Sequence, residues 1–134
     1  MQSYRDLIVW QKSIDLVTEI YELVELFPRE ERYALSSQIK RAAVSIPSNI
    51  AEGHNRNSDK EFVQFLCIAR GSLGELETQL IIAEKLNYAN KKYIEKLLND
   101  CYEIGKMLNS LIKKIKDEKW KLSNADRYLL TANS

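Results

Sequence analysis

The stretch that most constrains the fold is residues 38–53, QIKRAAVSIPSNIAEG, where a proline interrupts a regular helical pattern. Apolar residues recur every three to four positions, which is typical of an amphipathic helix. Pro47 lies inside this period, where a proline removes a backbone hydrogen bond and kinks or breaks a helix. Because the period continues in register beyond Pro47, we predict one helix kinked at Pro47 and not two helices joined by a loop. The apolar positions are Leu35, Ile39, Ala42, Ile46, Ile50 and Gly53.

A polar stripe runs beside this apolar stripe, also at spacings of three and four residues. Helices normally turn such a face to solvent, which is one interpretation. The other interpretation is a polar line buried against a neighbouring helix or subunit, and the pattern leaves both open. The stripe consists of Arg41, Ser45, Asn49, Glu52 and Arg56.

The scarcity of turn-forming residues favours long helices. The chain has 134 residues, enough for one domain with a sizeable core, but only 4 Gly and 2 Pro. The apolar run at residues 7–10 is too short for a secretory signal, and no stretch reaches the length of a membrane span. We therefore expect a cytoplasmic protein with no membrane partner, in which Cys67 and Cys101 are reduced core thiols.

Helical periodicity divides the chain into four segments. Ser58 with Glu61 matches the capping-box pattern at a helix start, and Asn90 is a typical N-cap. Four long helices with short connectors predict an all-α fold, an antiparallel up-down-up-down four-helix bundle. We assign residues 1–121 to the bundle domain and 122–134 to a polar C-terminal tail, frayed or docked against a neighbour. The predicted helices cover residues 6–26, 33–54, 59–86 and 91–117.

Two features indicate more apolar surface than one four-helix core needs. The first predicted helix carries two adjacent apolar stripes, a face wider than one partner helix covers. The third contains Gly71 and Gly74, and glycines within a strong helical pattern usually have a packing reason, so we infer that another backbone comes close. We therefore predict a homo-oligomer. The stripes are Leu7, Trp10, Ile14, Val17, Tyr21 and Val24, and beside them Leu16, Ile20, Leu23 and Phe27.

The antiparallel order of the helices also predicts a specific contact. The second and third helices are joined by a short turn, so residues near 41 lie level with residues 71–75. We predict a partly buried ion pair between Arg41 and Glu75. Because burying charges is costly, such a pair would fix the helix register more than it stabilises the fold.

Residue types that support catalysis are scarce. The single histidine, His54, lies in a predicted polar turn without flanking metal ligands, and the Glu-x-x-His pairs of di-iron bundles are absent. The sequence has no phosphate-binding glycine loop and no G-x-S-x-G turn, and Cys67 has no histidine partner that could activate it. We thus predict a non-enzymatic protein with no cofactor, no metal and no small-molecule substrate.

Basic residues are the one functional signal, although the net charge is only +1. They cluster at the end of the fourth predicted helix, and others lie on the second. Lysines in a last turn complement the helix dipole, which is one explanation. The other is a surface that contacts nucleic-acid phosphates when copies are arrayed in an oligomer. The candidate contact residues are Lys40, Arg56, Lys113, Lys114, Lys116, Lys119 and Lys121.

Five runs of residues carry a resemblance to a known family: LIVWQK at 7–12, FPREE at 27–31, QIKRAA at 38–43, SIPSNIAEG at 45–53 and FLCIARGSLGEL at 65–76. Together they resemble the four-helix-bundle proteins encoded in intervening sequences of bacterial 23S ribosomal RNA genes, once labelled S23 ribosomal proteins. The resemblance covers about residues 4–115, nearly the whole domain. The SIPSNIAEG run is far more specific than a heptad pattern.

The resemblance implies a four-helix bundle that assembles as a ring-like homopentamer, with no established enzyme activity and an RNA role suggested by genomic setting. In a related branch, the accessory proteins of diversity-generating retroelements, pentamers bind the reverse transcriptase and nucleic acid through a basic surface. We therefore expect a scaffold or adaptor that binds RNA or a ribonucleoprotein weakly, or alternatively a reverse-transcriptase adaptor. The signature and structural residues are Arg41, Ser45, Pro47, Asn49, Glu52, Gly53, Gly71, Gly74 and Glu75.

Overall fold

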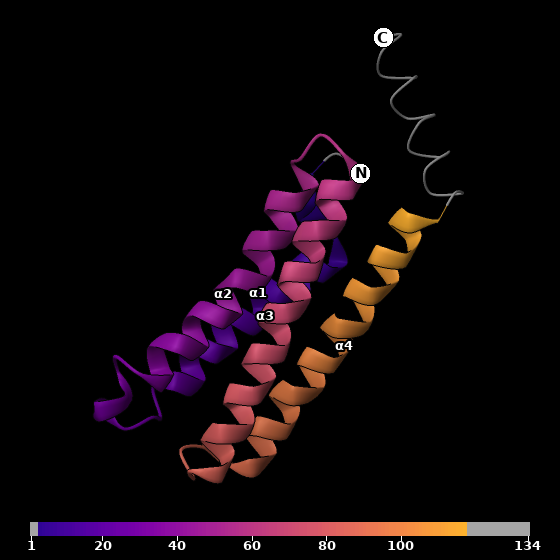
Figure 1. Ribbon diagram of the computed structural model, residues 1–134. Coiled ribbons are helices and arrows are strands. Elements are labelled where there is room, and N and C mark those ends of the chain that lie inside the picture. Colours follow the sequence, from indigo (N-terminus) through magenta and orange to yellow (C-terminus); the bar gives the residue numbers. More distant parts are fainter. Residues whose placement is uncertain (1–2, 118–134) are drawn as a thin grey trace, which may run out of the picture.

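The computed structural model describes residues 3–117, where the regular structure consists of helices (Figure 1). Each long helix packs against its neighbour in sequence, and α1 also contacts α4. These contacts produce an up-down arrangement of four helices, so the all-α prediction is confirmed. The predicted tail at residues 122–134 lies outside the described residues. The elements are η1 (Tyr4–Asp6), α1 (Ile8–Val24), η2 (Arg29–Glu31), α2 (Leu35–His54), α3 (Asp59–Lys85) and α4 (Lys91–Lys116).

Side-chain caps fix the starts of α3 and α4. The Ser58 hydroxyl accepts a hydrogen bond from the Glu61 amide (3.2 Å) and donates one to Glu61 Oε2 (3.1 Å). The first bond is the N-cap half of the predicted capping box, and the second joins the two side chains instead of returning to the Ser58 backbone N–H. At the start of α4, Asn90 Oδ1 accepts from the Lys92 amide (2.7 Å). Both caps satisfy backbone donors that a helix leaves unpaired at its first turn.

The helix α2 passes through Pro47 as one continuous element, which confirms a single helix in this stretch. Pro47 is buried on α2, and its ring offers no N–H to the carbonyl of Ala43. The kink at Pro47 stays a prediction.

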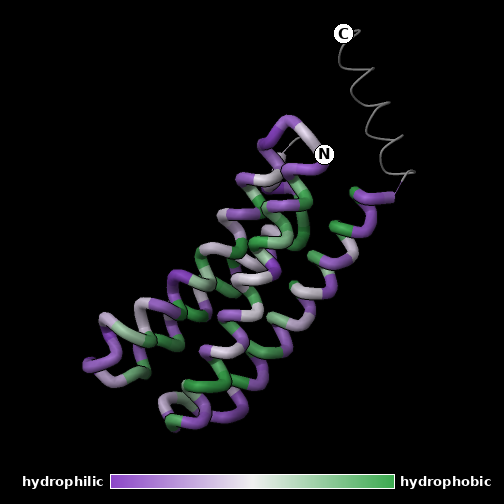
Figure 2. The backbone as a smooth tube through the Cα atoms, viewed as in Figure 1, coloured by the Kyte–Doolittle hydropathy of each residue, from purple (hydrophilic) through white to green (hydrophobic). Residues whose placement is uncertain are grey.

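Hydrophobic positions recur on the sides of the helices that face one another (Figure 2). On α1, most of the core face is the second of the two predicted stripes, because Leu16, Ile20 and Leu23 are buried. Val24 at the end of the first stripe is buried as well. In the first stripe, Trp10 is half-buried and Tyr21 is exposed. Fully buried side chains of the other helices complete the core, among them Ile39, Ile46, Ile50, Leu66, Leu76, Leu80, Ile94, Leu97, Ile104 and Leu108.

The closest approach of two helices at a glycine occurs at Gly53, near the end of α2. A Cβ atom added to Gly53 would lie 2.6 Å from Phe65 Cβ and 3.2 Å from the Phe62 carbonyl oxygen, both on α3. A Cβ added at Gly71 or Gly74 would meet nothing within 4 Å. Within residues 3–117 no other backbone lies close to Gly71 or Gly74, so a close backbone there stays a prediction about another copy, and Gly53 is the position in this chain that needs glycine.

Charged side chains join α1 to α4. Lys96 Nζ lies 2.6 Å from both carboxylate oxygens of Glu19 and 2.9 Å from Asp100 Oδ2. The hydrogen bonds to Glu19 and then to Asp100 raise the pKa of Lys96 above its ordinary value of 10.5. Beside them, burial and then the charges of Glu22 and Glu19 raise the pKa of Tyr93. We call Lys96, Glu19 and Asp100 the α1–α4 clamp.

We expect the α1–α4 clamp to make stability fall in alkaline solution. A pKa raised in the folded state contributes stability that is complete below the unfolded value, about 10.5 for lysine, and is lost as the pH rises above it. Lys96→Met should cost less than about 1 kcal/mol at pH 7, because the side chain is half-exposed. It should also flatten the loss of stability above about pH 10.5, where the contribution of the raised lysine pKa is lost.

Urea unfolding at several pH values measures this effect. Lys106→Met is the matched control, since the contact of Lys106 with Glu103 is long, 3.8 Å, and lies within one helix. If both variants show the same pH dependence as the unmodified protein, the clamp does not determine alkaline stability.

Candidate nucleic-acid interface

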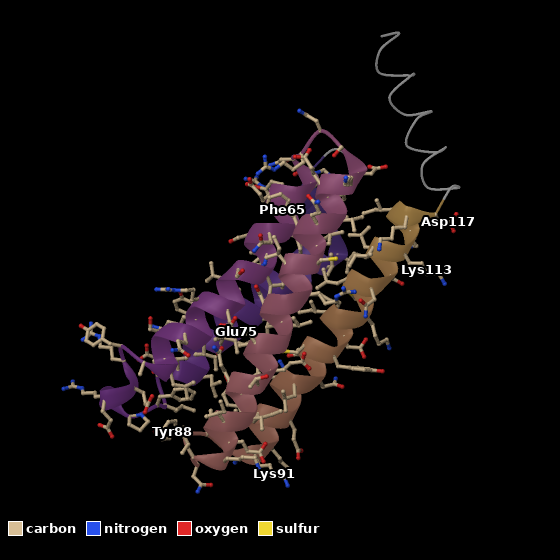
Figure 3. All side chains as sticks on the ribbon, viewed as in Figure 1. Phe65, Glu75, Tyr88, Lys91, Lys113 and Asp117 are labelled. Carbon is tan, nitrogen blue, oxygen red and sulfur yellow. The ribbon has the colours of Figure 1, made fainter. Side chains whose placement is uncertain are left out.

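The predicted lysine cluster lies at the C-terminal end of α4. Ile112 and Ile115 are buried, and this orients Lys113, Lys114 and Lys116 toward solvent. Figure 3 labels Lys113 near this end of the helix. None of the three lysines forms an ion pair with another residue of the described chain. They complement the negative end of the helix dipole and leave their ammonium groups available to an external anion. Two further candidates, Lys119 and Lys121, lie outside the described residues.

Arg56 is at the same end of the molecule but is engaged within the chain. Its guanidinium group forms an ion pair with Glu52 (2.7 Å) and lies 4.8 Å from the centre of the Phe65 ring. The side chains of Arg56 and Glu52 both remain accessible to solvent. The contact of Arg56 with the Phe65 ring is a cation–π arrangement. The turn between α2 and α3 and the end of α4 lie at one end of the bundle (Figure 1). We call the end of the bundle that carries Arg56, Lys113, Lys114 and Lys116 the basic end, although acidic residues of the same elements, among them Glu52, Asp59 and Asp117, lie there too.

Lys40 belongs to a different part of the surface. Its Nζ atom lies 4.9 Å from the centre of the Tyr21 ring, which joins α2 to α1. Lys40 is in the first half of α2, away from the turn that carries Arg56. The structure thus places Arg56, Lys113, Lys114 and Lys116 at one end of the bundle and separates Lys40 from them.

The polar stripe of α2 is divided between the two predicted environments. Ser45 and Asn49 are half-buried: Ser45 Oγ lies 2.8 Å from Ser72 Oγ on α3. The Asn49 side-chain amide donates to the Ser45 carbonyl (2.7 Å) and to Ser45 Oγ (2.9 Å). Arg41 and Glu52 are exposed. The middle of the stripe therefore packs against α3, and its ends face solvent.

The predicted Arg41–Glu75 ion pair is absent from the contacts of residues 3–117. Glu75, labelled in Figure 3, is exposed, and its carboxylate accepts a hydrogen bond of 3.3 Å from the Gln79 side chain one turn later. Arg41 is exposed as well. Because both side chains are exposed, each charge can be solvated by water instead of by the other. Positions at the same height on two neighbouring helices are therefore not sufficient to form this ion pair.

Two apolar surfaces are exposed apart from the lysines of α4. Ile68, Ile81 and Ile82 are exposed on α3, with exposed Gly71 and Gly74 between them. These five positions fall within about half of the helix circumference. The second surface, which sequence reasoning missed, is a groove of about 270 Å³ between α1 and α2. We call it the α1–α2 groove. Its lining residues are Tyr4, Trp10, Ile14, Val17, Val44, Pro47, Ser48 and Ala51.

The side chains of Cys101 and His54 pack against other residues of the bundle. Burial, followed by the charges of Glu77 and Asp100, raises the pKa of Cys101 to about 12, so its thiol keeps its proton at neutral pH. The His54 ring packs edge-on against Phe62, with ring centres 5.6 Å apart. Residues 3–117 contain no group of three or more His, Cys, Asp or Glu side chains suited to hold a metal ion. No helix in the same range is both long and apolar enough to cross a membrane.

Comparison with known proteins gives the family. The family model described as 23S rRNA-intervening sequence protein matches residues 5–110. No curated protein matches the chain. A solved structure from Bacteroides thetaiotaomicron, described as a protein with unknown function from the S23 ribosomal protein family, is 32% identical. The similarity covers 79% of this chain and 96% of that chain, with a TM-score of 0.74. The chain belongs to the 23S ribosomal RNA intervening-sequence protein family.

Proposed function

We propose that the protein is a non-enzymatic, cytoplasmic, homo-oligomeric scaffold or adaptor that contacts RNA or a ribonucleoprotein through the basic end of the bundle. The observation that carries this proposal is the set of exposed lysines in the last turn of α4, Lys113, Lys114 and Lys116. Lysine ammonium groups attract phosphates without reading the bases. Repetition of this basic end around an oligomer would turn weak contacts into useful avidity.

The predicted kink at Pro47 fits this proposal. Pro47 lines the α1–α2 groove, so a bend of α2 at this residue would set the shape of an apolar surface. A crystal structure of Pro47→Ala with α2 as bent as in the unmodified protein would count against it.

Assembly is supported by the exposed apolar face of α3. Isoleucines at positions 68, 81 and 82 are exposed around glycines that leave room for a close helix from another copy. The number five comes from the resemblance to the family. We expect Ile68→Asp to lower the mass of the assembly several-fold toward that of the subunit, because a carboxylate would be buried in the contact.

Light scattering at micromolar concentration tests the assembly. Tyr33→Asp is the matched control, because Tyr33 is 87% exposed and lies on the connector outside α3. A subunit mass for the unmodified protein would contradict the homo-oligomer. Loss of assembly in the Tyr33 variant alone would place the contact elsewhere.

We expect RNA binding to be electrostatic and independent of sequence. Changing Lys113, Lys114 and Lys116 to glutamate should weaken binding about 10- to 100-fold for every RNA tested and leave assembly intact. The reason is that fewer phosphate contacts form, so binding releases fewer counterions from the RNA. Binding to the unmodified protein should fall steeply with salt. The measurement is anisotropy of labelled RNAs of unrelated sequence at several salt concentrations.

The opposite end of the bundle supplies the control. Changing Lys85, Lys91 and Lys92 to glutamate alters the net charge equally, but these residues flank the turn between α3 and α4. Equal losses in both triple variants would mean that only net charge matters. The RNA proposal fails if no RNA binds at low salt, or if one sequence binds tightly at high salt.

The alternative, an accessory adaptor of a retroelement reverse transcriptase, rests on the resemblance and on the same basic end. Affinity capture from the native host, with bound RNA and protein both identified, distinguishes the two functions. Recovery of a reverse transcriptase would favour the adaptor, and recovery of RNA or ribosomal particles without it would favour the first function.

A further inference from the structure

The α1–α2 groove is an apolar surface without an occupant among residues 3–117. None of its eight lining residues is charged. Trp10 packs edge-on against Tyr4, with ring centres 5.3 Å apart, and is only half-buried. Val44 on the opposite wall is 38% exposed. Exposing a contiguous apolar groove to water is unfavourable in free energy, so covering it with an apolar partner would stabilise the protein.

The chain itself provides a segment at the right end of the molecule. The helix α4 ends at Lys116, at the same end of the bundle as the start of α1 and the last turn of α2 (Figure 1). Residues 118–134 follow α4 in the sequence, and α4 contacts α1, so α1 is the helix that this segment would have to cross to reach the groove. An extended chain advances about 3.3 Å per residue, and a helix is about 10 Å wide, so a few residues suffice to cross α1.

The composition of this segment matches the uncharged lining of the groove. Within residues 118–134, large apolar or aromatic side chains occur at Trp120, Leu122, Tyr128, Leu129 and Leu130. The family match ends at residue 110, and the solved relative covers 79% of this chain. The segment therefore lies outside the range that the family model matches.

We propose that residues 120–130 of the same chain cover the α1–α2 groove, with apolar side chains packed against Trp10 and Val44. The groove would then be an intramolecular docking site, separate from the assembly face on α3 and from the lysines of α4.

The two tryptophans of the chain make this testable, because one is in the groove and the other is in the segment. In full-length protein carrying Trp120→Phe, Trp10 is the only tryptophan. We then compare three proteins: this background, the background with Leu129→Asp and Leu130→Asp, and the background with Asn124→Asp and Asn133→Asp. The last pair adds the same charge at polar positions.

We expect acrylamide quenching of Trp10 to rise at least twofold, with a red shift of its emission, in the leucine variant only. Far-ultraviolet circular dichroism shows whether the bundle keeps its helices in all three proteins. Equal quenching in all three would overturn the proposal. Protection of Trp10 that is lost on dilution would also overturn the proposal, because an intramolecular contact does not depend on protein concentration. If the leucine change then has no effect on quenching, a second copy covers the groove. If the leucine change raises quenching, the C-terminal segment of a neighbouring copy covers it.

Discussion

Gly53→Ala should destabilise the protein by about 1–3 kcal/mol, although alanine is the better helix former. The new methyl group would stand 2.6 Å from Phe65 Cβ and 3.1 Å from Phe62 Cδ1. A Cβ atom is fixed to its backbone, so Phe65 cannot turn away, and α2 and α3 must separate. Urea unfolding followed by circular dichroism measures the loss.

Gly74→Ala is the control for this substitution. It also replaces a helical glycine, but its new methyl group meets nothing within 4 Å among residues 3–117. The gain in helix propensity should then appear undiminished, up to about 1 kcal/mol, when both variants are compared in the same state of assembly. Equal stability of the two variants would show that α2 and α3 have room to move apart at Gly53.

Ile20→Ala should destabilise the protein by about 2–5 kcal/mol. Ile20 is 0% exposed, so its truncation leaves a cavity that the surrounding helices fill only in part. The equivalent change at Ile8, which is 61% exposed on the same helix, should alter stability by less than about 0.5 kcal/mol.

Thermal or urea unfolding of the two variants therefore identifies the core face of α1. A larger loss for Ile8→Ala than for Ile20→Ala would mean that α1 is rotated relative to the arrangement described above. A loss of similar size in both would indicate that exposed Ile8 is covered by another copy.

The number and extent of the helices could be predicted because their signals are local. The Ser58 and Asn90 caps lie next to the backbone groups that they satisfy, and apolar spacing follows from the helix repeat. The core face of α1 could not be chosen in the same way. Both of its stripes are apolar, and the positions of α2 and α4 decide that Ile20 is buried and Trp10 only half-buried.

Contacts between distant residues were the least predictable. A glycine in a helical pattern does not indicate how near the next helix lies, so Gly53 and Gly74 look alike in sequence and differ in the structure. Long charged side chains have many rotamers and can reach water, so level placement of Arg41 and Glu75 does not make an ion pair. In the candidate site, the lysines at the end of α4 were predictable from their sequence alone.

The cation–π partners of Lys40 and Arg56 could not be predicted from the sequence. Tyr21 and Phe65 belong to other helices, and each comes near its cation only after those helices have packed. A charge count therefore overstates how many basic residues are free to meet a phosphate. The sequence predicted seven contact residues, of which Lys113, Lys114 and Lys116 are described without a competing partner.

The packing of each helix against its neighbour in sequence has a consequence for how the chain reaches its native state. The entropy cost of closing a loop is small when the two contacting segments are joined by a short connector. Such a topology has low contact order, and helical proteins of this kind fold in microseconds to milliseconds. A growing chain can pair α1 with α2, and then α2 with α3, before α4 has been synthesised. Both the α3–α4 and the α1–α4 contacts must wait for the last helix. Of these two, the α1–α4 contact joins the beginning of the chain to its end, and the pair of Lys96 with Glu19 is part of it.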